Sequence, residues 1–271
     1  MKRKYFSTPY IIWVIGFTLF PLITIAISAF TDESGSFTLE NIFAIADPIN
    51  LQALIFSLAI AFGCTVICIL LAYPAALALK SFHFKKKGFT IFLLVLPMWM
   101  NFILRILAWQ MILSRNGILN FLLGKLGLSP LNISNTWISL MIGMVYDFLP
   151  YMILPIFNAI SDIDEDTIEA ARDLGAGSVA VFRKVIFPLS MPGMLSGIVM
   201  VFVPAMTSFV IADILGGGKL QLIGNIIEEE FIRSMNWHLG SGLSISLMIL
   251  VLISMAFTMR NDLEEKGTKI W

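Results

Sequence analysis

Two aspartates, Asp147 and Asp213, stand in apolar stretches of the sequence, where an ionisable side chain is unusual. A carboxylate is costly away from water, so at membrane depth it is a candidate functional group. Carboxylates and aromatic faces together can replace water around a cation. The aromatic residues that could line the same route are Trp99, Trp109, Tyr146, Tyr151 and Phe209. These residues are predicted to form a pathway for a cationic solute.

Each of these residues also has a structural explanation. Asp147 could form an ion pair with Arg105, which stands in a neighbouring apolar stretch. Aromatic residues of membrane proteins often form belts at the lipid interface or pack in the protein interior. Arg105 also argues against a purely cation-attracting tunnel, unless its charge is neutralised. Both explanations stay open on the sequence alone.

The sequence contains no motif for catalysis, metal binding or nucleotide binding. A phosphate-binding loop needs G-x-x-x-x-G-K-[ST], but the run from Gly216 to Lys219 is followed by Leu220 and has Asp213 where the first glycine belongs. The two histidines, His83 and His238, have no companions at metal-ligand spacing. No Ser/His/Asp set is found either. We therefore predict no catalytic residue, no metal and no cofactor in this chain.

Composition places the chain in a membrane. Hydrophobic residues make up 58% of the 271 residues and charged residues 13%, whereas soluble domains carry roughly 25% charged residues. The 18 acidic and 18 basic residues are too few to cover a soluble core of this size. A net charge of zero gives no argument for nucleic-acid binding. Cys64 and Cys68 lie in an apolar run and are predicted to be buried small hydrophobes.

Several apolar stretches are long enough to cross roughly 30 Å of bilayer hydrocarbon as helices of about 20 residues. They lie near Pro9–Phe30, Leu51–Leu79, Phe89–Leu113, Trp137–Ile160, Gly193–Leu215 and Leu239–Met259. Lys and Arg concentrate on one side in this arrangement, notably at residues 2–4, 85–87 and 183–184. Because cytoplasmic loops are enriched in Lys and Arg, both termini are predicted to be cytoplasmic. We predict an all-α membrane protein of about six transmembrane helices, in a single domain over residues 1–271.

The loop between the fourth and fifth predicted spans, about residues 161–190, has the pattern of two short helices. Ser161 and Asp164 are predicted to cap the first helix, and Gly175 suits the left-handed turn that ends it. Ser178 is predicted to cap the second, which is expected to end before Pro188. Helices this short are marginal in water and too charged to span a bilayer. They are therefore expected to dock against a partner.

The same loop resembles a known family motif. The run from Glu169 through Gly175 to Pro188 follows the pattern E-A-A-x3-G-x9-I-x-L-P of permease subunits of binding-protein-dependent ABC importers. The departures are Val185 for Ile and Phe187 for Leu, both apolar exchanges. The resemblance implies a type I ABC importer permease fold, with a coupling helix seated on a cytoplasmic ATPase. The residues implied in that coupling are Glu169, Ala170, Ala171, Gly175 and Pro188.

Other segments resemble the spermidine/putrescine permeases of that family. They are residues 37–41, 146–155, 204–206, 213–218 and 222–225. The resemblance implies polyamine import by alternating access, in the inner (cytoplasmic) membrane of a bacterium. The implied partners are two copies of an ATPase that binds ATP and magnesium, a second homologous permease, an extracytoplasmic substrate-binding protein and the lipid bilayer. No nucleic acid is expected, and the chain itself is expected to be non-catalytic.

Three alternatives stay open. The same permease architecture could serve another small solute, such as ferric ion, sulfate or an osmolyte, although the acidic outer loops weakly disfavour anions. A secondary transporter or channel would work without an ATPase and would leave the loop around Glu169 unexplained. A structural membrane scaffold would tolerate the loss of transport altogether.

Overall fold

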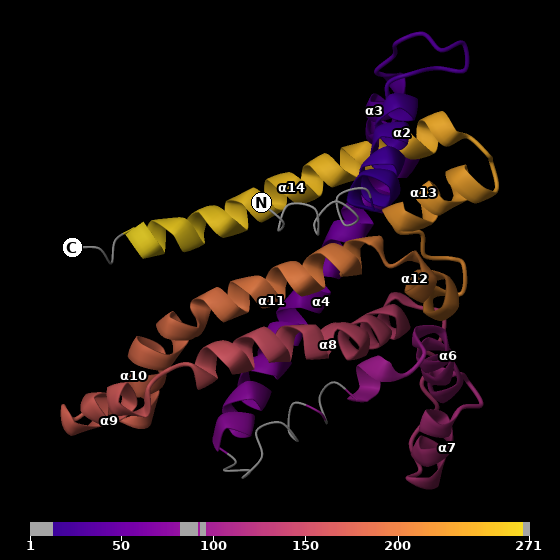
Figure 1. Ribbon diagram of the computed structural model, residues 1–271. Helices are drawn as coiled ribbons and strands as arrows, with labels where there is room; N and C mark the ends of the chain where they lie inside the picture. Colours follow the sequence, from indigo (N-terminus) through magenta and orange to yellow (C-terminus); the bar gives the residue numbers. More distant parts are fainter. Residues whose placement is uncertain (1–12, 82–91, 93–95, 268–271) are drawn as a thin grey trace. The chain divides into compact units, whose positions relative to one another are not determined.

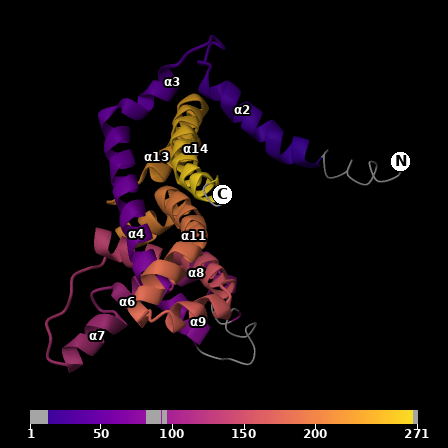
Figure 2. The ribbon, with the colours of Figure 1, turned by 90° about the vertical axis from the view of Figure 1, so that its left-hand side faces the viewer.

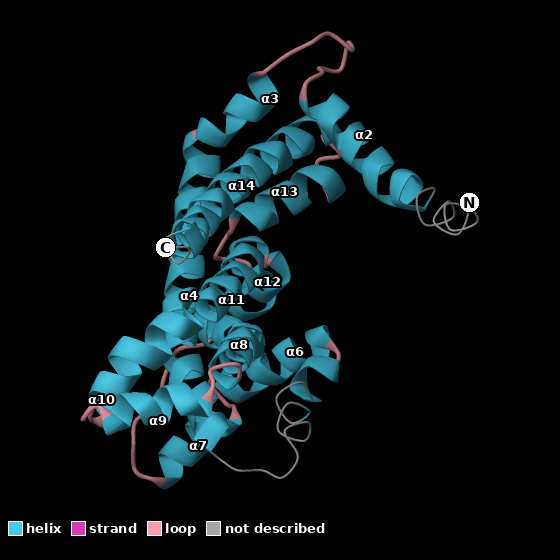
Figure 3. Cartoon of the chain, turned by 60° about the vertical axis from the view of Figure 1, so that its left-hand side comes forward, coloured by secondary structure: helices cyan, strands magenta, loops and turns pink. Residues whose placement is uncertain are grey.

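The computed structural model describes residues 13–81, 92 and 96–267, and their regular structure is helical (Figure 1; Figure 3). The basic clusters predicted at residues 2–4 and 85–87 lie outside the described residues, and so does His83. The beginnings of the first and third predicted spans also lie outside them. The prediction of an all-α protein is confirmed for the described part of the chain.

The described residues form a series of helices. In chain order they are η1 (Ile15–Leu19), α2 (Phe20–Ala29), α3 (Glu40–Phe43), η2 (Ala44–Ala46), α4 (Pro48–Ser81), η3 (Leu96–Trp99), α6 (Phe102–Leu113), α7 (Ile118–Lys125), α8 (Trp137–Ser161), α9 (Glu165–Asp173), α10 (Ser178–Val181), η4 (Phe182–Ile186), α11 (Phe187–Thr207), α12 (Phe209–Gly216), α13 (Ile223–Ile232) and α14 (Trp237–Gly267).

Among the described residues, five helical segments are long and apolar enough to cross a membrane. They are Pro48–Lys80, Phe102–Lys125, Trp137–Ser161, Ser178–Thr207 and Trp237–Ala256. A shorter apolar helix, Ile15–Ala29, corresponds to the described part of the first predicted span. Cys64 and Cys68 are fully buried in α4 and are not joined by a disulfide, as predicted.

The contacts divide the chain into two compact units. The first consists of residues 1–55 and 223–254. Its buried cluster joins Ala53 at the start of α4 with Ile226 on α13 and Leu243 on α14. The prediction of one permease domain over the whole chain remains a prediction.

The second unit consists of residues 56–222 and 255–271, and it contains every predicted site residue. In it, α8 and α11 pack side by side (Figure 1; Figure 2). At Gly193 on α11, an added Cβ would lie 2.5 Å from the carbonyl oxygen of Pro155 and 2.5 Å from the Cβ of Ala159. Small residues at such a crossing let membrane helices approach closely.

The predicted bounds of the fifth span, Gly193–Leu215, are wrong. Continuous helical structure begins at Ser178 and ends at Thr207. Ser208 then leaves helical geometry, with φ −77° and ψ 67°, before α12 begins. The break follows one turn after Pro204, which removes a backbone donor from the helix. Apolar residues continue through the break, so hydropathy could not locate it.

Candidate functional site

The loop that carries the predicted coupling residues begins with α9, which ends in a left-handed turn at Gly175. The φ angle of Gly175 is +86°. Its N–H donates to the carbonyl of Arg172 (2.8 Å), and the N–H of Ala176 donates to the carbonyl of Ala171 (3.1 Å). These two bonds form a Schellman motif, in which the left-handed position favours glycine because it has no Cβ. The predicted helix-ending role of Gly175 is confirmed.

The predicted caps of the two loop helices are wrong. Ser161 is the last residue of α8 and does not cap α9. Asp164 does occupy the position before α9, but its side chain makes no capping hydrogen bond. Ser178 is the first residue of α10, and Gly177 stands in the cap position before it. Each boundary holds more than one residue of a capping type, so the pattern alone could not say which one lies outside the helix.

Pro188 does not end the second loop helix, contrary to the prediction. Helix α10 continues through the π-helical segment η4 into α11, and Pro188 lies in the first turn of α11. In this wide turn the N–H of Phe187 donates to the carbonyl of Phe182, five residues earlier. Pro188 lacks the N–H that would bond to the preceding turn, and the wide turn of η4 directly before it accommodates this missing donor. The loop therefore continues directly into a long apolar helix.

The five predicted coupling residues lie in this loop at different depths. Glu169, Ala170 and Gly175 are exposed, whereas Ala171 and Pro188 are half-buried. Glu169 also lines a cavity of about 290 Å³ beside α9. The residues around this cavity are Leu77, Lys80, Ile160, Glu165, Ile168, Glu169, Arg172 and Ile186.

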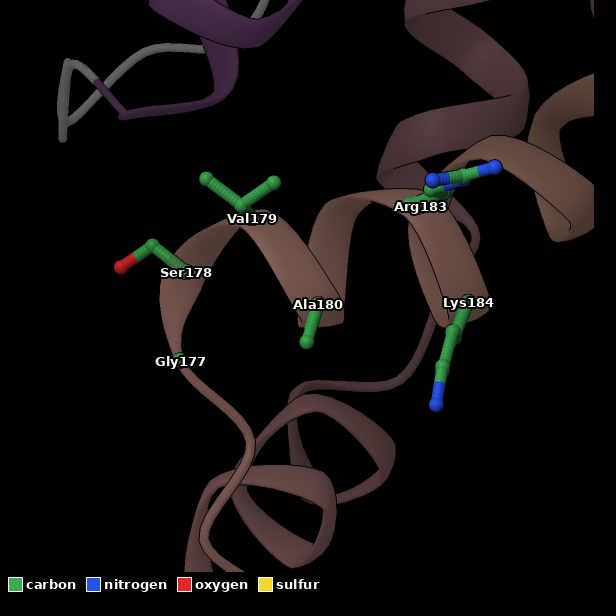
Figure 4. A pocket seen from close by; sticks show the side chains of 6 residues that line it. All are labelled: Gly177, Ser178, Val179, Ala180, Arg183 and Lys184. Carbon is green, nitrogen blue, oxygen red and sulfur yellow. The ribbon is translucent and has the colours of Figure 1, made fainter.

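The loop exposes apolar side chains among its charged ones. Leu174 is 90% exposed and Val179 is 79% exposed. Val179 borders a surface hollow of about 530 Å³, with Arg183 and Lys184 at its other end (Figure 4). The remaining lining residues are Gly177, Ser178 and Ala180. Leu174 lies outside the long apolar helices and Val179 lies in the first turn of the segment Ser178–Thr207. Exposed apolar side chains next to charged ones, as here, are typical of a protein-binding surface.

Arg105 on α6 and Asp147 on α8 form an ion pair, in which Nη2 of the arginine donates to Oδ1 of the aspartate. Both residues are buried. The guanidinium carbon of Arg105 also lies 6.0 Å from the centre of the Phe102 ring. The structural explanation considered for Asp147 is thus observed, and its negative charge is compensated in this structure.

The structure brings two of the predicted aromatic residues together next to this pair. The rings of Trp109 on α6 and Tyr146 on α8 have centroids 5.2 Å apart and planes at 63°. Tyr151, one turn further along α8, is 38% exposed. Trp99 in η3 is 76% exposed, and its ring centre lies 6.0 Å from that of Phe92.

Two predicted pathway residues lie on α12: Phe209 and Asp213. Phe209 is half-buried and Asp213 is exposed. Two side chains that the sequence patterns did not single out hold the end of α12. Gln110 on α6 donates to the carbonyl of residue 214 (2.9 Å), and Ser139 on α8 donates to the carbonyl of residue 215 (2.8 Å). Gln110 and Ser139 are polar side chains inside apolar helices. This polarity could have indicated their role, because polar side chains of membrane helices form hydrogen bonds to neighbouring helices.

Comparison with protein families gives a match that covers most of the chain. Residues 69–266 match the family described as "Binding-protein-dependent transport system inner membrane component". The chain belongs to this family. The match includes the loop from α9 to η4 and all five predicted coupling residues, so the resemblance inferred from the E-A-A pattern is confirmed.

Individual relatives agree with this assignment. The permease is 42% identical over 247 residues to the spermidine/putrescine transport system permease protein PotB of Haemophilus influenzae, covering 88% of this chain and 86% of that protein. It is 37% identical over 247 residues to the protein of the same name from Escherichia coli, covering 88% of this chain and 90% of that protein. The permease is therefore a membrane subunit of an ABC importer.

A solved structure shows the same fold. A chain of a bacterial alginate ABC transporter, in complex with its alginate pentasaccharide-bound periplasmic protein, matches the permease with a TM-score of 0.81. The match covers 98% of the permease and 94% of that chain at 15% sequence identity. At this identity the likeness concerns the fold alone, and it confirms the predicted type I importer permease fold.

Proposed function

We propose that this permease imports polyamines, with spermidine and putrescine as the first candidates, and that an ATPase docked on the loop from α9 to η4 drives it. The observation that carries the proposal is the exposed apolar tip of that loop, Leu174 and Val179. Sequence identity of 42% and 37% to spermidine/putrescine permeases supports the choice of substrate.

The composition of the loop suits a protein partner. Exposed acidic residues occupy α9, and the basic residues Arg183 and Lys184 occupy η4. Leu174 and Val179 lie between these two groups in the chain. An apolar centre with a charged rim is the usual composition of a protein interface. The ATPase, present in two copies, would bind ATP and magnesium, and this chain would supply no catalytic group.

A polyamine is a flexible chain of ammonium groups, which carboxylates and aromatic faces can bind in place of water. Asp213 is the better placed of the two predicted carboxylates, because it is exposed on α12 whereas Asp147 is buried. The aromatic residues that would contribute are Trp99, Trp109, Tyr146, Tyr151 and Phe209.

Transport would proceed by alternating access. ATP-driven closure of the ATPase pair would move the loop, and the attached helices would convert this movement into opening toward the outside. Prolines inside the long helices, at Pro74, Pro150, Pro155 and Pro204, ease bending there. The break between α11 and α12 would present backbone groups to the substrate, as discontinuous helices do in other transporters.

The remaining partners follow from the importer class. A second, homologous permease would complete the membrane part, and an extracytoplasmic binding protein would deliver the substrate. In the inner membrane, both termini of the chain would be cytoplasmic, on the same side as the ATPase.

Docking is tested by co-purification of the permease complex with its ATPase. The double variant Leu174→Asp/Val179→Asp is expected to reduce the recovered ATPase by about tenfold or more, because buried apolar contacts at an interface centre carry much of its energy. Leu126→Asp is the matched control, since Leu126 is 74% exposed but lies on the other side of the membrane in the predicted topology. Full recovery of ATPase with the double variant would contradict the docking.

The substrate is tested by competition. Uptake of labelled spermidine by cells that carry the complete importer is expected to fall with excess unlabelled putrescine, and to be unaffected by sulfate, ferric ion or an osmolyte. Strong competition by one of these other solutes would reject the polyamine assignment while leaving the importer assignment intact.

A further inference from the structure

Lys80, in the last turn of α4, is attached to the end of α8. Its Nζ donates to the carbonyl oxygen of Ile160 (2.9 Å) and to that of Ile163 (3.3 Å). Ile160 lies in the last turn of α8, and Ile163 is buried in the link that leads to α9. A helix C-terminus presents carbonyls without intrahelical partners and a partial negative charge, so an ammonium group binds well there.

Tyr73 attaches the same helix to the other end of the loop. Its hydroxyl forms a hydrogen bond with that of Ser190 on α11. Because the hydroxyl of Ser190 donates to the carbonyl of Phe187 (3.1 Å), the tyrosine is the donor to the serine. The ring of Tyr73 also packs against Phe182 and Phe187, with centroids 5.5 Å and 5.8 Å apart. Tyr73 and Ser190 are both buried.

These two attachments lie on one face of one helix. Tyr73 and Lys80 are seven residues apart, which is close to two helical turns. Lys80 binds the chain just before α9, and Tyr73 binds it just after α10. The cavity of about 290 Å³ is lined by Leu77 and Lys80 on α4, by Ile160 at the end of α8 and by Ile186 just before α11. The two ends of the loop, just before α9 and just after α10, are thus both attached to α4. Open space remains next to α9.

We propose that the movement of the loop is transmitted to α4 through the helix face that carries Tyr73 and Lys80. Lys80 and Tyr73 are then positioning residues for coupling. When the docked ATPase displaces the loop, the two attached ends of the loop move the end of α4 as well. Pro74, next to Tyr73 in α4, lacks the N–H that would bond to the preceding turn, so α4 bends most easily at this level. This inference rests on the proposed docking of an ATPase.

The test compares ATP hydrolysis with substrate uptake in the complete importer, reconstituted in vesicles with its binding protein and spermidine. Lys80→Met is expected to keep assembly and ATP hydrolysis but to lower the uptake per ATP by about tenfold, as expected for the loss of a charge-assisted hydrogen bond. Lys80→Arg, which keeps the donor and the charge, is expected to restore uptake per ATP to within about twofold. Lys125→Met, at the end of α7, is the matched control and is expected to have no effect.

Tyr73→Phe distinguishes a loss of coupling from a loss of folding, because it removes only the hydroxyl and keeps the ring packed against Phe182 and Phe187. It is expected to lower uptake per ATP by about threefold, less than Lys80→Met, since a neutral hydrogen bond is weaker than a charged one. Unchanged uptake per ATP in both Lys80→Met and Tyr73→Phe would overturn the inference. So would a proportional loss of assembly, hydrolysis and uptake in both. If instead the wild-type importer showed no ATPase stimulation by the loaded binding protein, the proposed function itself would fail.

Discussion

Arg105 of α6 and Asp147 of α8 form a salt bridge in which the two side chains are only 9% and 6% exposed. A buried pair of this kind is costly to break, because either partner alone leaves an uncompensated charge. The pair joins the two helices that also carry Trp109 and Tyr146 in contact. Asp147 therefore has a packing role in this structure, in addition to the transport role predicted for it.

Single neutralisation of this pair is expected to destabilise the permease. Asp147→Asn and Arg105→Met should each lower the free energy of unfolding by about 3–5 kcal/mol, whereas the double variant should recover most of the loss. Thermal unfolding of the purified protein in detergent checks this order. Single variants as stable as the wild type would contradict the buried pairing. Transport by a stable double variant would also show that Asp147 is not needed in the pathway.

The left-handed turn at Gly175 predicts a specific order of substitutions. An alanine at φ +86° is expected to cost about 1–2 kcal/mol, asparagine less, and valine more because it is β-branched. Nothing lies within 4 Å of the position of an added Cβ, so the cost comes from the backbone and not from a clash. Hydrogen exchange of the amides of residues 170–176 measures the opening of the turn. Equal exchange in the alanine, asparagine and valine variants would show that the turn does not depend on glycine.

The close crossing of α8 and α11 predicts a difference between two glycines. Gly193→Ala would place a Cβ 2.5 Å from the Pro155 carbonyl oxygen, so it is expected to push the helices apart and lower the melting temperature. Gly124→Ala on α7 is the control, because an added Cβ there meets nothing within 4 Å. Alanine is the better helix former by about 1 kcal/mol, so this control is expected to be neutral or stabilising. A Gly193→Ala variant as stable as Gly124→Ala would argue against the crossing.

The loop between α2 and α3 is organised by Asp32. Its Oδ1 accepts hydrogen bonds from the hydroxyl of Ser34 (2.6 Å), the N–H of Ser34 (2.9 Å) and the N–H of Ser36 (2.9 Å). These bonds, the Ser34 hydroxyl first and Ser36 next, lower the pKa of Asp32 below its ordinary value of 3.8. Because the pKa is lower in the ordered loop, the bonds stabilise the loop above the ordinary pKa range and are lost as the pH falls through the lowered pKa.

At neutral pH, Asp32→Ala is therefore expected to accelerate hydrogen exchange at Ser34 and Ser36, whereas Glu33→Ala is not. In the wild type, protection of these amides is expected to persist down to about pH 4 and to fall only under more acidic conditions. Loss of protection already near neutral pH would contradict the role of the carboxylate.

The features that the sequence predicted correctly depend on local signals. The long apolar stretches follow from composition alone, and the turn at Gly175 follows from a conformation that other residues rarely adopt. The spacing from Glu169 to Pro188 predicts the correct family. In each case the residues that determine the feature are near one another in the chain.

The features that were missed depend on contacts between distant segments. The helical break at Ser208 interrupts an apolar run, and α12 is held by Gln110 and Ser139 from two other helices. The helix continues past Pro188 because a wide π turn precedes it, and hydropathy does not predict such a turn. Likewise, the pairing of Asp147 with Arg105 could be proposed from the sequence. Only the packing of α6 against α8 determines that this pair forms.

The most direct test of the account is spermidine uptake into vesicles that contain the permease with its second permease, with or without the ATPase. We predict uptake only when the ATPase, ATP and the loaded binding protein are all present, and its loss in the Leu174→Asp/Val179→Asp variant. Uptake by the permease without ATPase, driven by an ion gradient or the membrane potential, would contradict the account and identify a secondary transporter.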